Sequence, residues 1–170
     1  MICCVTGHRP EGFPFPPNDI ERCLQYKRDL YGAVKELLDK GCRHFITGMA
    51  EGVDMDFAFA VLYYKKRYRN VFLEAALPYP RNRNIQNSRN RLIDQCDCVT
   101  YVSEEYFDGC MQKRNCYMVD KADLVIAVWN GKRKGGTWNT INYARRKNKP
   151  IRYIMLEKPQ EDEPEQMRLM

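Results

Sequence analysis

The chain has 170 residues, 44% of them hydrophobic and 29% charged, which is ordinary for a soluble globular protein and enough for one domain with a full core. No apolar run reaches membrane-spanning length, and the first residues carry neither the basic segment nor the cleavage pattern of a signal peptide. We therefore expect a cytoplasmic protein without a membrane partner.

The formal net charge of +6 is unevenly distributed. Residues 157–170 hold five acidic and two basic residues and are rich in Pro, Glu and Gln, so we expect a disordered acidic tail after a folded domain of residues 1–156. The body is correspondingly basic. Such a body suits a nucleotide or a polyanion, and it equally suits a protein with a merely basic surface.

The eight cysteines do not indicate a disulfide framework or a zinc site. Cys3 and Cys4 lie in an apolar run, and Cys96 and Cys98 lack both the two-residue spacing and the histidine pair of a zinc site. We interpret the cysteines as small buried side chains in a reducing compartment, and we expect no metal site and no catalytic cysteine.

The first predicted element is a buried strand over residues 1–6. Prolines in the following segment exclude a helix or a central strand, so the chain leaves this strand in a rigid loop. Ligands bind at the carboxyl ends of strands in open parallel sheets, which places Thr6, Gly7, His8 and Arg9 at a ligand edge. Arg9 is the better phosphate partner, whereas His8 either faces the ligand or caps the loop by bonding backbone.

A long helix is predicted over residues 20–40, capped by Asn18 and Asp19 and ended by Gly41. A second buried strand follows at residues 44–47.

That strand runs into Gly48-Met49-Ala50-Glu51-Gly52-Val53-Asp54 and a helix predicted over residues 53–68. Gly48 and Gly52 remove side chains that would keep a ligand from the backbone, and the helix start supplies unpaired N–H groups for an anion. Asp54 either caps this helix or takes a ribose hydroxyl. The loop matches neither G-x-G-x-x-G nor the P-loop, so alone it is a weak signal.

A third strand is predicted at residues 71–77 and a polar helix at 81–93. The arginines of this helix are either a solvated face or reach phosphates, and Arg81 is favoured because it begins at the ligand edge. A fourth strand follows at residues 98–102.

The remaining predicted elements are a helix at residues 111–121, an apolar strand at 123–129, a helix at 137–147 and a strand at 151–156. Between the apolar strand and its helix, Asn130, Gly135, Gly136 and Thr137 belong to a second glycine loop, which also predicts an anion-binding helix start. Strands that alternate with helices predict a single α/β, Rossmann-like domain with a doubly wound parallel sheet and helices on both faces.

Three segments together resemble the SLOG superfamily, a Rossmann-like group that includes the Lonely Guy phosphoribohydrolases and the DNA-processing protein DprA. The segments are Thr6-Gly7-His8-Arg9-Pro10, the Gly48–Asp54 loop and residues 111–137, and the pattern is most similar to uncharacterised YpsA-like members. The resemblance implies a nucleotide-derived ligand at the carboxyl edge of the sheet, no required cofactor and association into a homo-oligomer.

One segment resembles the Lonely Guy enzymes in particular. Met111-Gln112-Lys113-Arg114-Asn115 followed by Met118 is similar to their Met-x-x-Arg-Lys-x-x-Met, which implies an active-site role for Arg114. Their catalytic glutamate, however, aligns with Thr140, and Arg133 and Lys134 replace two loop glycines. A cationic loop fits a ligand with more phosphate groups than a nucleoside monophosphate has, such as NAD or ADP-ribose.

Three functions compete. We expect a cytosolic sensor or regulator that binds such a ligand without turnover, which accounts for both anion loops and the missing glutamate. The alternative is an enzyme that cleaves a nucleotide N-glycosidic bond, with Glu51 or Asp54 as the carboxylate and Arg9 and Arg114 on phosphate. A third possibility is DprA-like binding of single-stranded DNA, with Trp138, Tyr106 and Tyr79 as stacking residues.

Overall fold

The computed structural model describes residues 1–157, so all but the first residue of the predicted acidic tail lies outside the described residues. Within residues 1–157, six parallel strands form one sheet in the order β4-β3-β2-β1-β5-β6. The strands are β1 (Ile2–Thr6), β2 (His44–Thr47), β3 (Phe72–Leu77), β4 (Cys98–Tyr101), β5 (Leu124–Trp129) and β6 (Ile151–Met155). The helices are α1 (Ile20–Asp39), α2 (Val53–Lys65), α3 (Ser88–Asp94), α4 (Cys110–Lys121) and α5 (Gly136–Arg146), and a 3-10 turn, η1, spans Pro10–Gly12.

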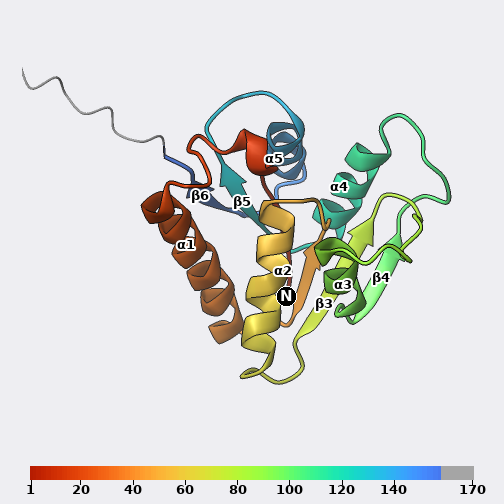
Figure 1. Ribbon diagram of the computed structural model, residues 1–170, viewed down its shortest axis with the longest axis horizontal. Coiled ribbons are helices and arrows are strands. Elements are labelled where there is room, and N and C mark those ends of the chain that lie inside the picture. The colour runs from red at the N-terminus through yellow and green to blue at the C-terminus, as the bar shows by residue number, and fades with distance from the viewer. Residues whose placement is uncertain (158–170) are drawn as a thin grey trace, which may run out of the picture.

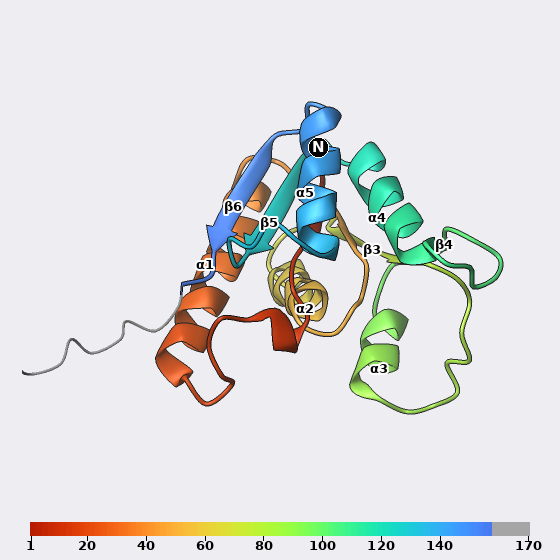
Figure 2. The same cartoon turned by 90° about the horizontal axis from the view of Figure 1, so that it is seen from above.

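Helices cover both faces of the sheet, with α1, α2 and α3 on one face and α4 and α5 on the other (Figures 1 and 2). Side chains alternate across the strands, so Phe45 packs with α1 and α2 while its neighbour Ile46 packs with α4 and α5. The predicted doubly wound α/β fold is therefore confirmed.

The direction of winding reverses beside β1. From β1 the chain moves through β2 and β3 to β4, and α4 then carries it back to β5 on the opposite side of β1. In sheets of this kind ligands bind beyond the carboxyl ends of the strands at such a reversal. The fold thus directs attention to the loops that follow β1 and β5.

The predicted helix over residues 81–93 is wrong at its start, because α3 begins only at Ser88. Asparagine side chains bind the backbone instead: Asn82 accepts the N–H of Asn84 at 2.9 Å, and Asn87 caps α3 by accepting the N–H of Asn90 at 2.8 Å. Such local bonds compete with the helix and set its boundary. In the part of the chain that the structure describes, no helix is long and apolar enough to cross a membrane.

Nothing in the sequence singles out Glu74, yet its carboxylate is fully buried in β3. It accepts hydrogen bonds from His44 Nε2 (2.8 Å), Thr100 Oγ1 (2.8 Å), Tyr117 OH (2.7 Å) and Lys121 Nζ (3.0 Å). Burial raises the pKa of this carboxyl, but these hydrogen bonds outweigh burial and lower it to about 2. The ionised group ties β2, β3 and β4 to α4.

Glu74→Gln is expected to lower the free energy of unfolding by about 3 kcal/mol at pH 7, the equivalent of the pKa difference between the folded and unfolded states. Because the folded-state pKa is depressed, this stability is present above pH 4.5 and is lost as the pH falls towards 2. Urea unfolding at pH 7 and pH 3 measures both effects. The exposed Glu104, changed to Gln, is the control and should leave stability near wild type. A Glu74→Gln loss of equal size at both pH values would contradict the assigned ionisation.

Candidate functional site

Three loops meet beyond the carboxyl ends of β1, β2 and β5, and the loop after β1 lies at their centre. The carbonyl oxygen of His8 accepts the N–H of Val53 at 3.1 Å, which ties this loop to the start of α2. Asn130, which follows β5, donates its backbone N–H to His8 Nε2 at 3.0 Å and its side-chain amide to the Gly12 carbonyl at 2.9 Å. The sequence places these loops at the same edge, and the structure joins them by hydrogen bonds.

Gly48 and Gly52 make room for protein atoms, which differs from the ligand-approach explanation suggested by the sequence. A Cβ at Gly52 would lie 2.5 Å from the carbonyl oxygen of His8, and the φ angle of Gly52 is +98°. A Cβ at Gly48 would lie 2.6 Å from Nη1 of Arg114. At Gly136, by contrast, an added Cβ meets nothing within 4 Å, so open space lies in front of the second loop.

A cavity of about 320 Å³ opens at the reversal point between β1 and β5, and we call it the main cavity. Eight of the residues predicted from the sequence line it, namely Thr6, Gly7, His8, Arg9, Asp54, Arg114, Gly136 and Thr137. Residues from the loops after β1 and β2 and from the first turns of α4 and α5 therefore face one space.

A smaller cavity of about 170 Å³, the arginine cavity, shares Arg9 and Arg114 with the main cavity. Gly48, Glu51 and Arg81 line it, as the sequence places them at this edge. The other predicted residues serve the loops themselves: Gly52 packs against the loop after β1, Asn130 binds that loop, and Gly135 precedes α5.

Arg114 is the most deeply buried cation of the site, with only 5% of its surface exposed. Its Nη1 donates to the carbonyl oxygen of Gly48 at 2.6 Å, and its Nε donates to Oδ1 of Asn115 at 2.8 Å. Burial lowers the pKa of Arg114, while the charge of Asp54 raises it. Among residues 1–157, no carboxylate forms an ion pair with this guanidinium.

Four arginines surround the two cavities, and within the described chain none of them is ion-paired. The pKa of Arg89 is lowered by burial and then by the charges of Arg81, Arg114 and Arg9, so the four cations repel one another. Arg89 is half buried and donates from Nε to the carbonyl oxygen of Met49 at 2.9 Å. The sequence favours Arg81 as a phosphate partner, whereas Arg89 is one of several arginines that could equally be solvated. A role for Arg89 could not be inferred because the sequence does not reveal that α3 begins only at Ser88.

Asp54 brings a carboxylate to the main cavity from the first turn of α2. It is buried, and its Oδ2 accepts the N–H of Ala50 at 3.2 Å. Burial raises the pKa of Asp54, and the charges of Arg114 and Arg9 oppose that rise. The group is thus an acceptor held in a cationic environment.

His8 is neutral and has a defined tautomer. Its Nε2 accepts the backbone N–H of Asn130, a group that can only donate, so the ring proton is on Nδ1. Nδ1 lies 3.5 Å from Oγ1 of Thr137, on the first turn of α5. Burial and the charge of Lys132 lower the pKa of His8. His8 thus binds backbone, as one of the two alternatives expects, and it also lines the main cavity.

Three helices direct their amino ends at the main cavity without a side-chain cap. These are α2, α4 and α5, which follow Gly52, Gly109 and Gly135 respectively. In contrast, α1 and α3 are capped by Asp19 and Asn87. Uncapped first turns leave N–H donors and the positive end of the helix dipole for an anion, although the first N–H of α2, that of Val53, and the first N–H of α4, that of Cys110, already bind the carbonyls of His8 and Phe107.

The chain is similar to two curated proteins. One is the "Uncharacterized SPbeta prophage-derived protein YoqJ" of Bacillus subtilis (strain 168), 29% identical over 141 residues, which cover 72% of this chain and 82% of that protein. The other is the "UPF0398 protein" of Ligilactobacillus salivarius (strain UCC118), 26% identical over 144 residues, which cover 81% of this chain and 79% of that protein. A family model, YpsA, described as the YspA SLOG family, matches residues 3–158 and thus spans all three loops of the site. The chain therefore belongs to the YspA SLOG family.

Proposed function

We propose that the protein binds the phosphate groups of a nucleotide-derived ligand, such as NAD or ADP-ribose, and acts as a cytoplasmic sensor or regulator without turnover. The observation that carries this proposal is Arg114, a buried guanidinium that lines a cavity and has no carboxylate partner within residues 1–157. The charge of Asp54 offsets only part of the cost of burying this guanidinium, and a bound phosphate offsets more of it by bidentate hydrogen bonds.

The surrounding groups fit the rest of such a ligand. Arg9 adds a second cation on the main cavity, and the N–H groups of Gly136 and Thr137 at the start of α5 donate to phosphate oxygens. Asp54 is an acceptor for a ribose hydroxyl. We assign NAD or ADP-ribose rather than a monophosphate because the arginine cavity continues the cationic surface beyond the main cavity.

Binding without turnover is favoured by the residue at the position of the Lonely Guy glutamate. Thr140 is only 3% exposed, and its Oγ1 donates to the carbonyl oxygen of Gly136 at 2.9 Å within α5. A hydroxyl bonded into its own helix cannot stabilise the oxocarbenium-like transition state of N-glycosidic cleavage as a carboxylate does.

Titration of the protein with ADP-ribose, NAD and pyrophosphate is the test. A ligand at 100 times its Kd adds about 2.7 kcal/mol to the unfolding free energy, which corresponds to a rise in Tm of about 5–10 °C. We expect such a rise, a measurable heat of binding, and weaker binding as salt increases. Absence of heat and of any Tm change with all three compounds would contradict the proposal.

The second candidate, cleavage of an N-glycosidic bond, is favoured only by Asp54, a carboxylate on the main cavity beside Arg114. It requires release of nicotinamide from NAD during incubation, and loss of that release in Asp54→Asn or Glu51→Gln. Single-stranded DNA binding finds less support, because Trp138 stacks on Trp129 at 5.2 Å and Arg145 lies over its ring, which leaves its faces occupied.

A further inference from the structure

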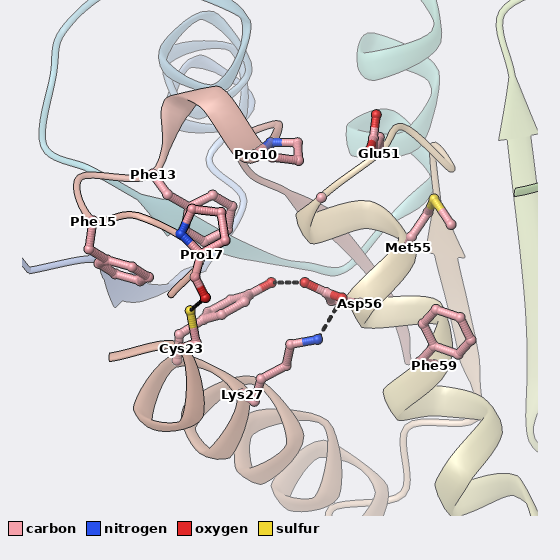
Figure 3. Close-up of a pocket in the computed structure, with 12 residues that line it drawn as sticks. Pro10, Phe13, Phe15, Pro17, Cys23, Lys27, Glu51, Met55, Asp56 and Phe59 are labelled. Carbon is pink, nitrogen blue, oxygen red and sulfur yellow. Dashed lines mark hydrogen bonds and ion pairs between the residues drawn. The ribbon is translucent and has the colours of Figure 1, made fainter. Parts of the chain in front are cut away.

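A third cavity, of about 310 Å³, lies between the loop after β1 and the helices α1 and α2 (Figure 3). We call it the apolar cavity and define it by Pro10, Phe13, Tyr26, Met55, Asp56 and Phe59. Its volume is at the lower end of the roughly 300–1,000 Å³ of small-molecule sites. The three functions considered from the sequence make no use of it.

Its walls are suited to a flat ring. Phe13 of the loop faces Met55 and Phe59 of α2 across the cavity (Figure 3). Phe13 is held in place by an edge contact with Tyr26, with ring centroids 5.2 Å apart. Phe59 is 44% exposed although it is apolar, so it has surface available for a partner. Aromatic and thioether side chains in this arrangement pack well on planar heteroaromatic rings.

The floor of the apolar cavity offers a polar anchor. The two oxygens of Asp56 accept hydrogen bonds from Tyr26 OH at 2.9 Å and from Lys27 Nζ at 2.8 Å (Figure 3). Each carboxylate oxygen has a second lone pair, so Asp56 can accept one or two further N–H donors. An amino-substituted nucleobase carries such donors on a flat ring, whereas a lipid chain carries no N–H donor and an apolar peptide carries its N–H donors on the backbone, away from any flat ring.

The apolar cavity adjoins the cationic site through one layer of backbone. Along the loop after β1, Arg9 and Glu11 line the main cavity while Pro10 and Phe13 line the apolar cavity. Glu51 lines both the apolar cavity and the arginine cavity, so it lies on the rim between them. A ligand that crosses this rim places one end among aromatic side chains and the other among arginines.

We propose that the apolar cavity holds the base of the nucleotide whose phosphates lie among the four arginines. This inference rests on the proposed function, and it adds the base as a recognised part of the ligand. Stacking of the base on Phe59 provides affinity, and Asp56 selects bases that carry an amino group.

The test compares ADP-ribose, which has an adenine base, with inorganic pyrophosphate, which has none. Phe59→Ala is expected to weaken ADP-ribose binding about tenfold, the usual effect of one lost stacking contact, and to leave pyrophosphate binding within about twofold. Tyr63→Ala is the matched control, because Tyr63 is an equally exposed aromatic residue one turn further along α2 and lies outside the cavity. It should leave both affinities unchanged.

The possible outcomes separate the two proposals. If the wild type binds pyrophosphate and Phe59→Ala does not alter the affinity for ADP-ribose, the base assignment is wrong and the phosphate site stands. If the wild type binds neither compound, both proposals are wrong. Asp56→Asn supplies a second readout: it should reduce the preference for ADP-ribose over the hypoxanthine analogue, which lacks the amino group. An unchanged preference would remove Asp56 from base recognition.

Discussion

Arg114→Met is expected to lower the affinity for pyrophosphate and for ADP-ribose at least about 30-fold, because removal of a buried charged partner costs about 2–5 kcal/mol of binding. Stability should respond very differently. A buried charge without a carboxylate partner is expensive, and its replacement by an apolar side chain of similar length is often neutral or stabilising. We expect the free energy of unfolding to stay within about 1 kcal/mol of wild type, since the lost bond to the Gly48 carbonyl and the lost attraction to the buried Asp54 offset the relief.

Calorimetric titration and urea unfolding of the same protein preparation measure both quantities. Arg91→Met is the control, because Arg91 is an exposed arginine of α3 that lines neither cationic cavity. It removes the same formal charge and should change the affinity by less than about threefold. Normal pyrophosphate binding by Arg114→Met, or equal losses in the two variants, would show that Arg114 is not the phosphate partner.

Gly52→Ala is expected to lower the free energy of unfolding by about 3–5 kcal/mol and to abolish ligand binding, because two costs add at this position. The φ angle of +98° is strained for any residue with a Cβ, and the added Cβ would lie 2.5 Å from the carbonyl oxygen of His8. To relieve that overlap the loop after β1 must move away from α2. The bond between the Val53 N–H and the His8 carbonyl is then lost, and the main cavity loses its shape.

Gly41→Ala isolates the conformational part of this effect. Gly41 has a φ of +93°, close to that of Gly52, but an added Cβ there meets nothing within 4 Å. Gly41→Ala should therefore lower the free energy of unfolding by only about 1 kcal/mol and leave ligand binding intact. Urea unfolding of both variants gives the comparison. Equal destabilisation would mean that the close approach of the two loops contributes nothing to stability.

The sheet could be predicted from the sequence because the patterns that mark its strands and helices are local. Apolar runs such as residues 123–129 mark buried strands, and helical spacing between them implies parallel pairing with crossovers. The helix expected at residues 81–93 begins only at Ser88. Apolar spacing does not reveal hydrogen bonds between side chains and backbone, such as the one that the Asn84 N–H donates to the side chain of Asn82. The true boundary of the helix depends on those bonds.

The edge of the sheet at which the candidate site lies could be predicted, and most residues that line its cavities could be named, because glycines and prolines after strands mark loops at that edge. The roles of individual residues could not be predicted from the sequence. That Gly48 makes room for Arg114, or that Glu74 finds partners on three other elements, depends on contacts between segments far apart in the chain. The apolar cavity could not be predicted for the same reason, since Phe13 and Phe59 line one cavity only once the loop after β1 packs on α2.

A crystal structure of the protein with ADP-ribose tests the central claim most directly. We expect a phosphate group within hydrogen-bond distance of the Arg114 guanidinium and of the backbone N–H groups at the start of α5. A bound ADP-ribose whose phosphates lie outside the main and arginine cavities, with Arg114 untouched, would contradict it.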